Sequence, residues 1–383
     1  MLDKHRDAIE EAIEGTLETA KEVAKKTATK IVTLAFGEKK IIGIPRALGY
    51  YQQYPFLYGF FTYLGFEIVL SDKTSKKTLS DGSALVVSET CLPIKVYVGH
   101  VLNLINKGVK HIYVPSIQSI APKIYNCSKI RGLPDLIRNI IKADIEIIEA
   151  TLDKSEKNQG LFEFLKECVI KFRIKDEKLI KKALRAGFVV HNNFKVMMQH
   201  GMDYEQALKN AQNGQIIIPP KPEVKPVNVA VVSHGYNIYD TKVCMDIFKK
   251  LKSFNVGTLS AYNLTDEQLK DGMNILKSEV YWANELEMTG CAGHYFNSDL
   301  IDGIITVTAF GCGPDSLMIE RMARKSKNFN KPILNLTIDE HTGEAGFVTR
   351  LEAFCDMLFR KKRSRCDSGG RDERSTASTT MAT

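Results

Sequence analysis

The stretch Gly-Ile-Ile-Thr-Val-Thr-Ala-Phe-Gly-Cys-Gly-Pro-Asp-Ser, residues 303–316, contains the pattern that decides the fold. Its first six residues are rich in β-branched side chains, which is typical of a buried strand in a parallel sheet. A glycine-containing turn follows, and Pro314 suits the first helical position, where no backbone N–H is required. The stretch therefore predicts a strand, a short turn and a helix, the repeating unit of an α/β fold.

The same alternation extends along the chain in both directions. In the first half, we expect strands at 40–45, 67–70, 83–88, 111–115 and 145–148, and helices at 51–64, 93–106 and 135–142. In the second half, we expect strands at 228–232, 256–259, 303–308 and 333–338, and helices at 239–251, 314–323 and 346–358. Because short polar segments join these elements, the pattern predicts parallel sheets.

The 383 residues are too many for one ordinary core and indicate more than one domain. The proline-rich run 219–226 marks a boundary, because proline prevents a regular helix there. We expect an N-terminal helical arm at 1–36, a first α/β domain at 37–150, a helical connector at 151–218, a second α/β domain at 227–360 and a disordered tail at 361–383.

Composition excludes several classes of protein. Hydrophobic residues make up 44% of the chain and charged residues 26%, which are globular values. Every apolar run is shorter than the roughly 20 residues needed to cross a bilayer. The N-terminal residues mix acidic and basic side chains without an apolar core, which is unlike a secretory signal. We therefore expect a cytoplasmic protein with no membrane partner.

The net charge of +8 does not indicate a nucleic-acid-binding protein. Residues 360–383 contain seven Lys or Arg and three Asp or Glu, so 7 − 3 = 4 of these charges belong to the tail. The tyrosines and phenylalanines of residues 50–63 spread around a helix without interleaved basic residues, so we expect them to pack in a core. Neither a Gly-x-Gly-x-x-Gly loop after a first strand nor a phosphate loop is present, so we predict no nucleotide-binding residues.

Three of the eight cysteines lie where an α/β sheet usually binds its ligands, beyond the strand ends. Cys91 and Cys312 each follow a predicted strand and precede a proline by two residues, and Cys127 lies in the loop before the helix at 135–142. A thiol just before a helix meets the positive end of the helix dipole, which lowers its pKa. Three such thiols suit iron and sulfide, or zinc, and leave one metal position open.

The other cysteines are predicted to play no part in this site. Cys168, Cys244 and Cys355 fall within predicted amphipathic helices, where a cysteine is usually a small buried hydrophobe. Cys291 also fits helix packing, with a weaker pattern, and Cys366 belongs to the tail.

Several charged residues near the strand ends have two interpretations each. His341 and Glu344 follow the strand at 333–338, and they are either proton donors near a metal site or caps of the next helix. Lys95 either faces an anion, which would be a cluster with thiolates or a phosphate, or is a solvated lysine. Arg46 is either a contact for a phosphate or an ordinary surface residue. His234 follows the strand at 228–232 and either bonds its own turn or touches a ligand.

Five motifs between residues 40 and 358 together resemble the 2-hydroxyacyl-CoA dehydratase and benzoyl-CoA reductase superfamily, and more narrowly its activase-related branch. They are Ile-Gly-Ile-Pro-Arg-Ala-Leu at 42–48, Cys-Leu-Pro-Ile-Lys at 91–95, Cys127 with Gly-Leu-Pro-Asp at 132–135, Phe-Gly-Cys-Gly-Pro-Asp-Ser at 310–316 and Thr-Ile-Asp-Glu-His-Thr-Gly-Glu-Ala-Gly at 337–346. The resemblance implies two Rossmann-like domains and one 4Fe-4S cluster on Cys91, Cys127 and Cys312. The alternatives are a double-cubane cluster, as in a related branch, or zinc.

The same resemblance implies a function and partners. It points to a 2-hydroxyacyl-CoA dehydratase-type lyase or an acyl-CoA reductase component that acts on an acyl-CoA and receives low-potential electrons from a separate ATP-hydrolysing activase. A second superfamily subunit, or a second copy of the chain, would complete the active site. Two alternatives stay open: a non-catalytic electron-transfer or maturation partner with the same cluster, and a zinc-stabilised binding protein.

Overall fold

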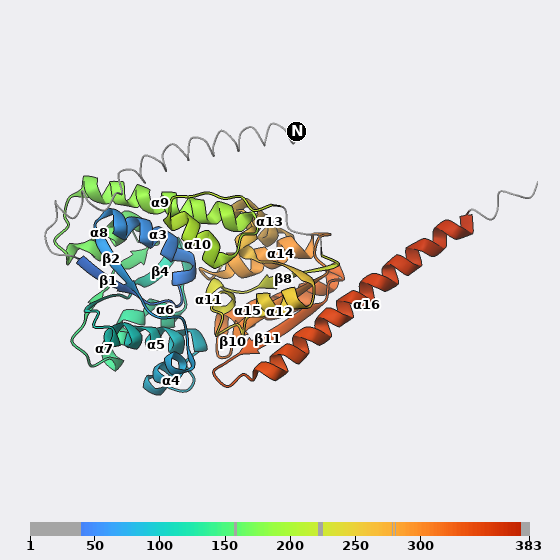
Figure 1. Cartoon of the computed structure of the whole chain (residues 1–383), viewed down its shortest axis with the longest axis horizontal. Helices are drawn as coiled ribbons and strands as arrows, with labels where there is room; N and C mark the ends of the chain where they lie inside the picture. The colour runs from blue at the N-terminus through green and yellow to red at the C-terminus, as the bar shows by residue number, and fades with distance from the viewer. Residues whose placement is uncertain (1–39, 157–158, 221–224, 278, 280, 377–383) are drawn as a thin grey trace, which may run out of the picture. The chain divides into compact units, whose positions relative to one another are not determined.

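The computed structural model describes residues 40–156, 159–220, 225–277, 279 and 281–376 (Figure 1). The chain forms two compact units. Unit 1 comprises Met1–Pro222 with Val280–Glu285, and unit 2 comprises Glu223–Glu279 with Leu286–Thr383. The predicted N-terminal arm at 1–36 lies outside the described residues.

Unit 1 contains a parallel sheet with the strand order β2-β1-β3-β6. Its strands are β1 (Lys40–Ile44), β2 (Phe66–Leu70), β3 (His111–Tyr113) and β6 (Glu146–Ile148). Residues such as Ile42 are fully buried because helices cover a parallel sheet on both faces. The parallel α/β fold predicted for this half is confirmed.

A second, smaller sheet of unit 1 follows β3 and β6 directly along the chain. It consists of β4 (Ser116–Ala121), β5 (Ile124–Tyr125) and β7 (Thr151–Asp153), with β4 antiparallel to β5 and parallel to β7. Trp282 forms a bridge beside Tyr125, and the Ala283 N–H donates to the Tyr125 carbonyl at 3.0 Å. This explains why a short segment from late in the chain belongs to unit 1.

The helices of unit 1 pack through small residues. They are α3 (Tyr50–Tyr63), α4 (Lys76–Leu85), α5 (Leu92–Asn106), α6 (Ser128–Arg131), α7 (Leu133–Ile140), α8 (Leu161–Ile170), α9 (Glu177–Gln199) and α10 (Tyr204–Gln212). A Cβ on Gly59 of α3 would lie 2.6 Å from the Ala186 carbonyl oxygen of α9, so only glycine allows this approach. Phe60 and Phe61 are fully buried, which confirms that the aromatic residues of α3 form a core.

The predicted strand at 83–88 is wrong, because most of it belongs to helix α4 and the loop that follows. Ser75 caps α4 by accepting from the Thr78 N–H, and this local signal begins a helix. Gly82 packs α4 against α5, since a Cβ there would lie 2.0 Å from the Lys95 carbonyl oxygen. Leu85 and Val87, whose apolar character suggested a strand, are exposed.

Unit 2 contains a parallel sheet with the order β11-β10-β8-β9. Its strands are β8 (Val227–Val232), β9 (Val256–Leu259), β10 (Gly303–Ala309) and β11 (Ile333–Ile338). Its helices are α11 (Gly235–Ile238), α12 (Ile247–Ser253), α13 (Asp266–Leu276), α14 (Cys291–Phe296), α15 (Gly313–Ser326) and α16 (Glu344–Thr376), and a π-helix spans Leu286–Gly290. All four predicted strands are confirmed, and β10 is buried throughout.

Two helices of unit 2 differ in extent from the prediction. The helix expected at 239–251 forms only in its second half as α12, because Met245 and Asp246 adopt left-handed φ angles of 51° and 54°. Helix α16 runs from Glu344 to Thr376, past residue 361, where the composition predicted a disordered tail (Figure 1). None of the described helices is both long and apolar enough to cross a membrane.

The two parallel sheets have the same topology. In each, the chain passes from the first strand to a neighbour on one side and then crosses to the other side. The crossing points lie between β1 and β3 in unit 1 and between β8 and β10 in unit 2. Ligands of open α/β sheets bind beyond the carboxyl ends of the strands at such switch points. The topology therefore predicts one ligand-binding place beyond β1 and β3 and another beyond β8 and β10.

Candidate functional site

Each of the three predicted ligand cysteines is the N-cap residue of a helix. Cys91 precedes α5, Cys127 precedes α6 and Cys312 precedes α15, and all three have extended backbone conformations. A proline in the first turn of α5 and of α15 supports the early helical position. The prediction that Cys91 and Cys312 lie just before a helix is confirmed, although α4 rather than a strand precedes Cys91.

A lysine side chain connects the segments that contain Cys91 and Cys127 within unit 1. The Lys129 ammonium, two residues after Cys127, lies 3.5 Å from the carbonyl oxygen of Glu89, two residues before Cys91. Lys95 is buried rather than solvated, and its ammonium donates to the Ser88 carbonyl at 2.8 Å. Both ammonium groups therefore contact the turn that leads to Cys91.

Cys312 lies in a tight turn at the carboxyl end of β10, beside the switch point of unit 2. Gly311 has a φ of +76°, which a glycine adopts without strain, and the Cys312 N–H donates to the Ala309 carbonyl at 3.2 Å. The Ser316 hydroxyl donates to the Cys312 carbonyl at 2.8 Å. These bonds hold the cysteine at the start of α15.

His234, Asp315 and Glu287 form a buried charged cluster at the same switch point. The imidazole Nε2 lies 2.9 Å from Asp315 Oδ1, and Nδ1 lies 3.4 Å from Glu287 Oε2. Burial alone lowers the pKa of His234, but the two carboxylates raise it to about 10. His234 is therefore an imidazolium, and it joins the end of β8, the π-helix and the first turn of α15.

Sequence reasoning missed the two carboxylates of this cluster. The sequence correctly predicts that His234 follows a strand, but it does not predict which residue His234 contacts. Asp315 is separated from His234 by 81 residues and Glu287 by 53, so no local pattern connects them. The one available signal was the position of Asp315 three residues after Cys312 in the Cys-Gly-Pro-Asp run.

The remaining described cysteines are packing residues, as predicted. Cys168, Cys244, Cys291 and Cys355 are all buried. Burial raises the pKa of Cys355 to about 11 and that of Cys244 to about 12, and it raises the pKa of Cys168 and Cys291 further. Cys244 lies in a turn before α12 rather than inside a helix. Burial thus disfavours the thiolate form of all four, as expected for packing residues.

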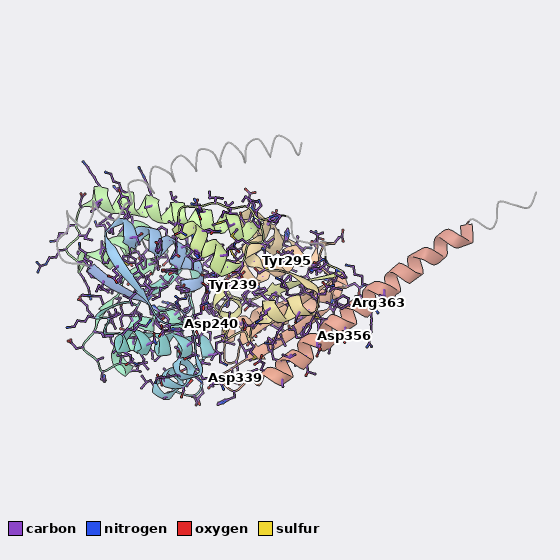
Figure 2. The ribbon with its side chains drawn as sticks, viewed as in Figure 1. Tyr239, Asp240, Tyr295, Asp339, Asp356 and Arg363 are labelled. Carbon is purple, nitrogen blue, oxygen red and sulfur yellow. The ribbon has the colours of Figure 1, made fainter. Side chains whose placement is uncertain are left out.

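His341 lies in the turn that follows Asp339, which Figure 2 labels, and Glu344 is the first residue of α16. The His341 side chain is exposed, and the backbone N–H of His341 donates to Asp339 Oδ1 at 3.0 Å. Glu344 pairs with Lys250 at 2.7 Å, and this ammonium lowers the pKa of the carboxyl. An ionised carboxylate in the first helical turn fits the capping interpretation, whereas the proton-donor role stays a prediction.

Arg46 follows β1 and lies beside the switch point of unit 1. The backbone N–H of Arg46 donates to Ser71 Oγ at 2.8 Å. The side chain is partly buried, and its Nε has neither solvent access nor a hydrogen-bond partner. Arg46 is thus not an ordinary surface arginine.

Within the described residues, no group of three or more His, Cys, Asp or Glu side chains is placed to hold a metal ion. Cys91 and Cys127 belong to unit 1 and Cys312 to unit 2. The three-cysteine site therefore stays a prediction.

Residues 41–264 match the model of a family described as the CoA enzyme activase uncharacterised domain. The chain belongs to this family. The match covers more than half of the chain, includes Cys91 and Cys127, and ends before Cys312. It links the chain to the activase and dehydratase superfamily without selecting a branch. A search of curated proteins finds no match.

Proposed function

We propose that the chain is an iron–sulfur component of an acyl-CoA-converting system, with one 4Fe-4S cluster on Cys91, Cys127 and Cys312. The observation that best supports this proposal is the position of these cysteines. Each one is a helix N-cap residue, a position that none of the other described cysteines occupies, and Cys127 and Cys312 are only partly buried.

The chemistry of the donor set fits such a cluster. Helix N-termini stabilise anionic sulfur, and the ammonium groups of Lys95 and Lys129 add positive charge at the turn that leads to Cys91. Three thiolates would leave one iron without a cysteine, open for exogenous chemistry. None of the other described cysteines is a helix N-cap residue, and this difference favours the single cluster over a double-cubane cluster.

The bound cluster would supply one-electron transfer at low potential. The chain has no phosphate loop, so a separate ATP-hydrolysing activase would deliver the electrons. The description of the family, which names a CoA enzyme activase, supports this context. The substrate would be an acyl-CoA, with Arg46 and Lys95 as proposed contacts, and a second superfamily subunit or a second copy of the chain would complete the active site.

Anaerobic metal analysis tests the proposal most directly. We expect about four iron and four sulfide per chain in the wild type, as one 4Fe-4S cluster requires. Cys312→Ala should lose most of both, whereas the matched control Cys355→Ala, at a buried packing cysteine, should retain them. Zinc without sulfide, or equal loss in the two variants, would contradict the cluster.

Two further measurements distinguish an enzyme from a carrier. With purified activase and ATP, the cluster of an enzyme component should be reduced faster than by a chemical reductant alone. Added acyl-CoA should then perturb the cluster spectrum. A cluster that responds to neither supports the alternative of a non-catalytic electron-transfer or maturation partner.

A further inference from the structure

The side chain of Arg46 lies beside two uncharged tyrosine side chains in unit 1. Its Cζ lies 5.9 Å from the centroid of the Tyr50 ring, which stacks on Tyr54 at 4.7 Å. Burial raises the pKa of both phenols, so both are neutral. The buried Nε is a donor without an acceptor, and such a group costs free energy until a partner binds it.

His100 is the second polar group in this place. It is fully buried, its Nε2 is 2.9 Å from Thr74 Oγ1, and its Nδ1 has no hydrogen-bond partner. Burial, together with the positive charge of Arg46, lowers the pKa of His100 to about 3. The imidazole is therefore neutral, and its Nδ1 has no partner. The segment after β2 connects it to Arg46, because Ser71 accepts from the backbone N–H of Arg46 and Thr74 bonds His100.

The carboxylates of this region are engaged with other cations. Asp72 accepts from Lys107 at 2.6 Å and from Asn103 at 3.0 Å. Glu205 pairs with Lys73 at 3.3 Å. With these charges compensated, Arg46 supplies an excess of one positive charge at the carboxyl end of β1, beside the switch point where α/β sheets bind ligands.

We propose that Arg46 and His100 bind the oxyanion group of a small molecule, either a carboxylate or a phosphate. The planar guanidinium presents parallel N–H donors that match two oxygens of such a group. His100 would supply a neutral N–H from Nδ1, and the Tyr50 ring would cover the guanidinium. A single positive charge favours a singly charged oxyanion over a dianion. The inference rests on the proposed function only in taking Arg46 as a substrate contact, and its test needs no cluster.

Calorimetric titration of the full-length, metal-free chain with acetate and with inorganic phosphate provides the test. At least one probe should bind saturably. Arg46→Gln should weaken that binding roughly tenfold to hundredfold, because it removes charge-assisted hydrogen bonds. Arg185→Gln, at an exposed arginine of α9, is the matched control and should change nothing. The probe that binds identifies the oxyanion.

A pair of His100 variants tests the second donor. Glutamine can place its amide near the position of Nε2 and keep the Thr74 contact, whereas asparagine places its amide near Nδ1. His100→Gln should weaken binding about fivefold, the effect of one lost hydrogen bond, and His100→Asn should weaken it less. Circular dichroism verifies that each variant is folded. Arg46→Lys keeps the positive charge and should therefore lose only part of the affinity.

The proposal is overturned if neither probe binds saturably, or if Arg46→Gln and Arg185→Gln bind alike. Equal affinity of the wild type and His100→Gln would remove His100 from the site. Iron analysis of Arg46→Gln separates the two proposals, because loss of anion binding with an intact cluster concerns this site alone.

Discussion

The two units have sheets of the same strand order but opposite chemistry where the first strand ends. Beyond β1, Arg46 has a buried Nε without a partner, and His100 is a neutral imidazole with one ring nitrogen available. Beyond β8, His234 is an imidazolium between the carboxylates of Asp315 and Glu287. Beyond β1 polar nitrogens have no hydrogen-bond partner, whereas beyond β8 the charged side chains pair with one another. The same topology thus supports a ligand site in unit 1 and a positioning cluster beside Cys312 in unit 2.

The largest effect is expected from removal of a carboxylate beside His234 in unit 2. Asp315→Ala removes one carboxylate from a buried imidazolium, which should lower the free energy of unfolding by about 3–5 kcal/mol. Urea denaturation, followed by circular dichroism, measures the change. A loss below about 1 kcal/mol, which is typical of a surface ion pair, would show that His234 and Asp315 do not form a buried ion pair.

The two histidines should respond to pH in opposite directions. The folded-state pKa of His234, about 10, exceeds the ordinary 6.5, so its stabilisation is complete below pH 6.5 and is lost as the pH rises through 10. The free energy of unfolding should fall by a few kcal/mol over this window. His234→Gln should remove this alkaline slope, and an unchanged slope in the variant would contradict the assignment.

His100 provides the acidic counterpart. Its folded-state pKa of about 3 lies below 6.5, so the unfolded chain binds a proton that the folded chain does not. Stability should therefore fall as the pH drops from 6.5 towards 3. Denaturation of His100→Gln beside the wild type isolates this contribution from that of the carboxylates, and identical acid slopes would argue against a neutral buried imidazole.

The smallest expected effect concerns Arg46. Because its buried Nε has no partner to lose, Arg46→Gln should change the free energy of unfolding by less than about 1 kcal/mol. Denaturation with and without the anion that binds measures this change. Added anion should stabilise the wild type and not the variant. A large destabilisation of Arg46→Gln without anion would indicate a structural role instead.

Local features of the chain were predictable because short segments determine them. The β-branched run before Cys312 and the proline after it predict a strand, a turn and a helix, and the structure contains all three. The segment 83–88 was misread because its apolar residues resemble a strand. Its actual state depends on the capping of α4 and on the close approach of Gly82 to α5.

The amino-acid sequence by itself determined the α/β class, most strands and the N-cap positions of Cys91 and Cys312, since propensity and capping act over a few residues. Only the tertiary structure decided which distant side chains meet. Strand order brings His234 to Asp315, and the packing of α5 against its neighbours buries His100 within reach of Arg46. The charge state of each histidine follows from that burial and those neighbours, because desolvation and nearby charges set a pKa, and neither can be read from residues adjacent in the chain.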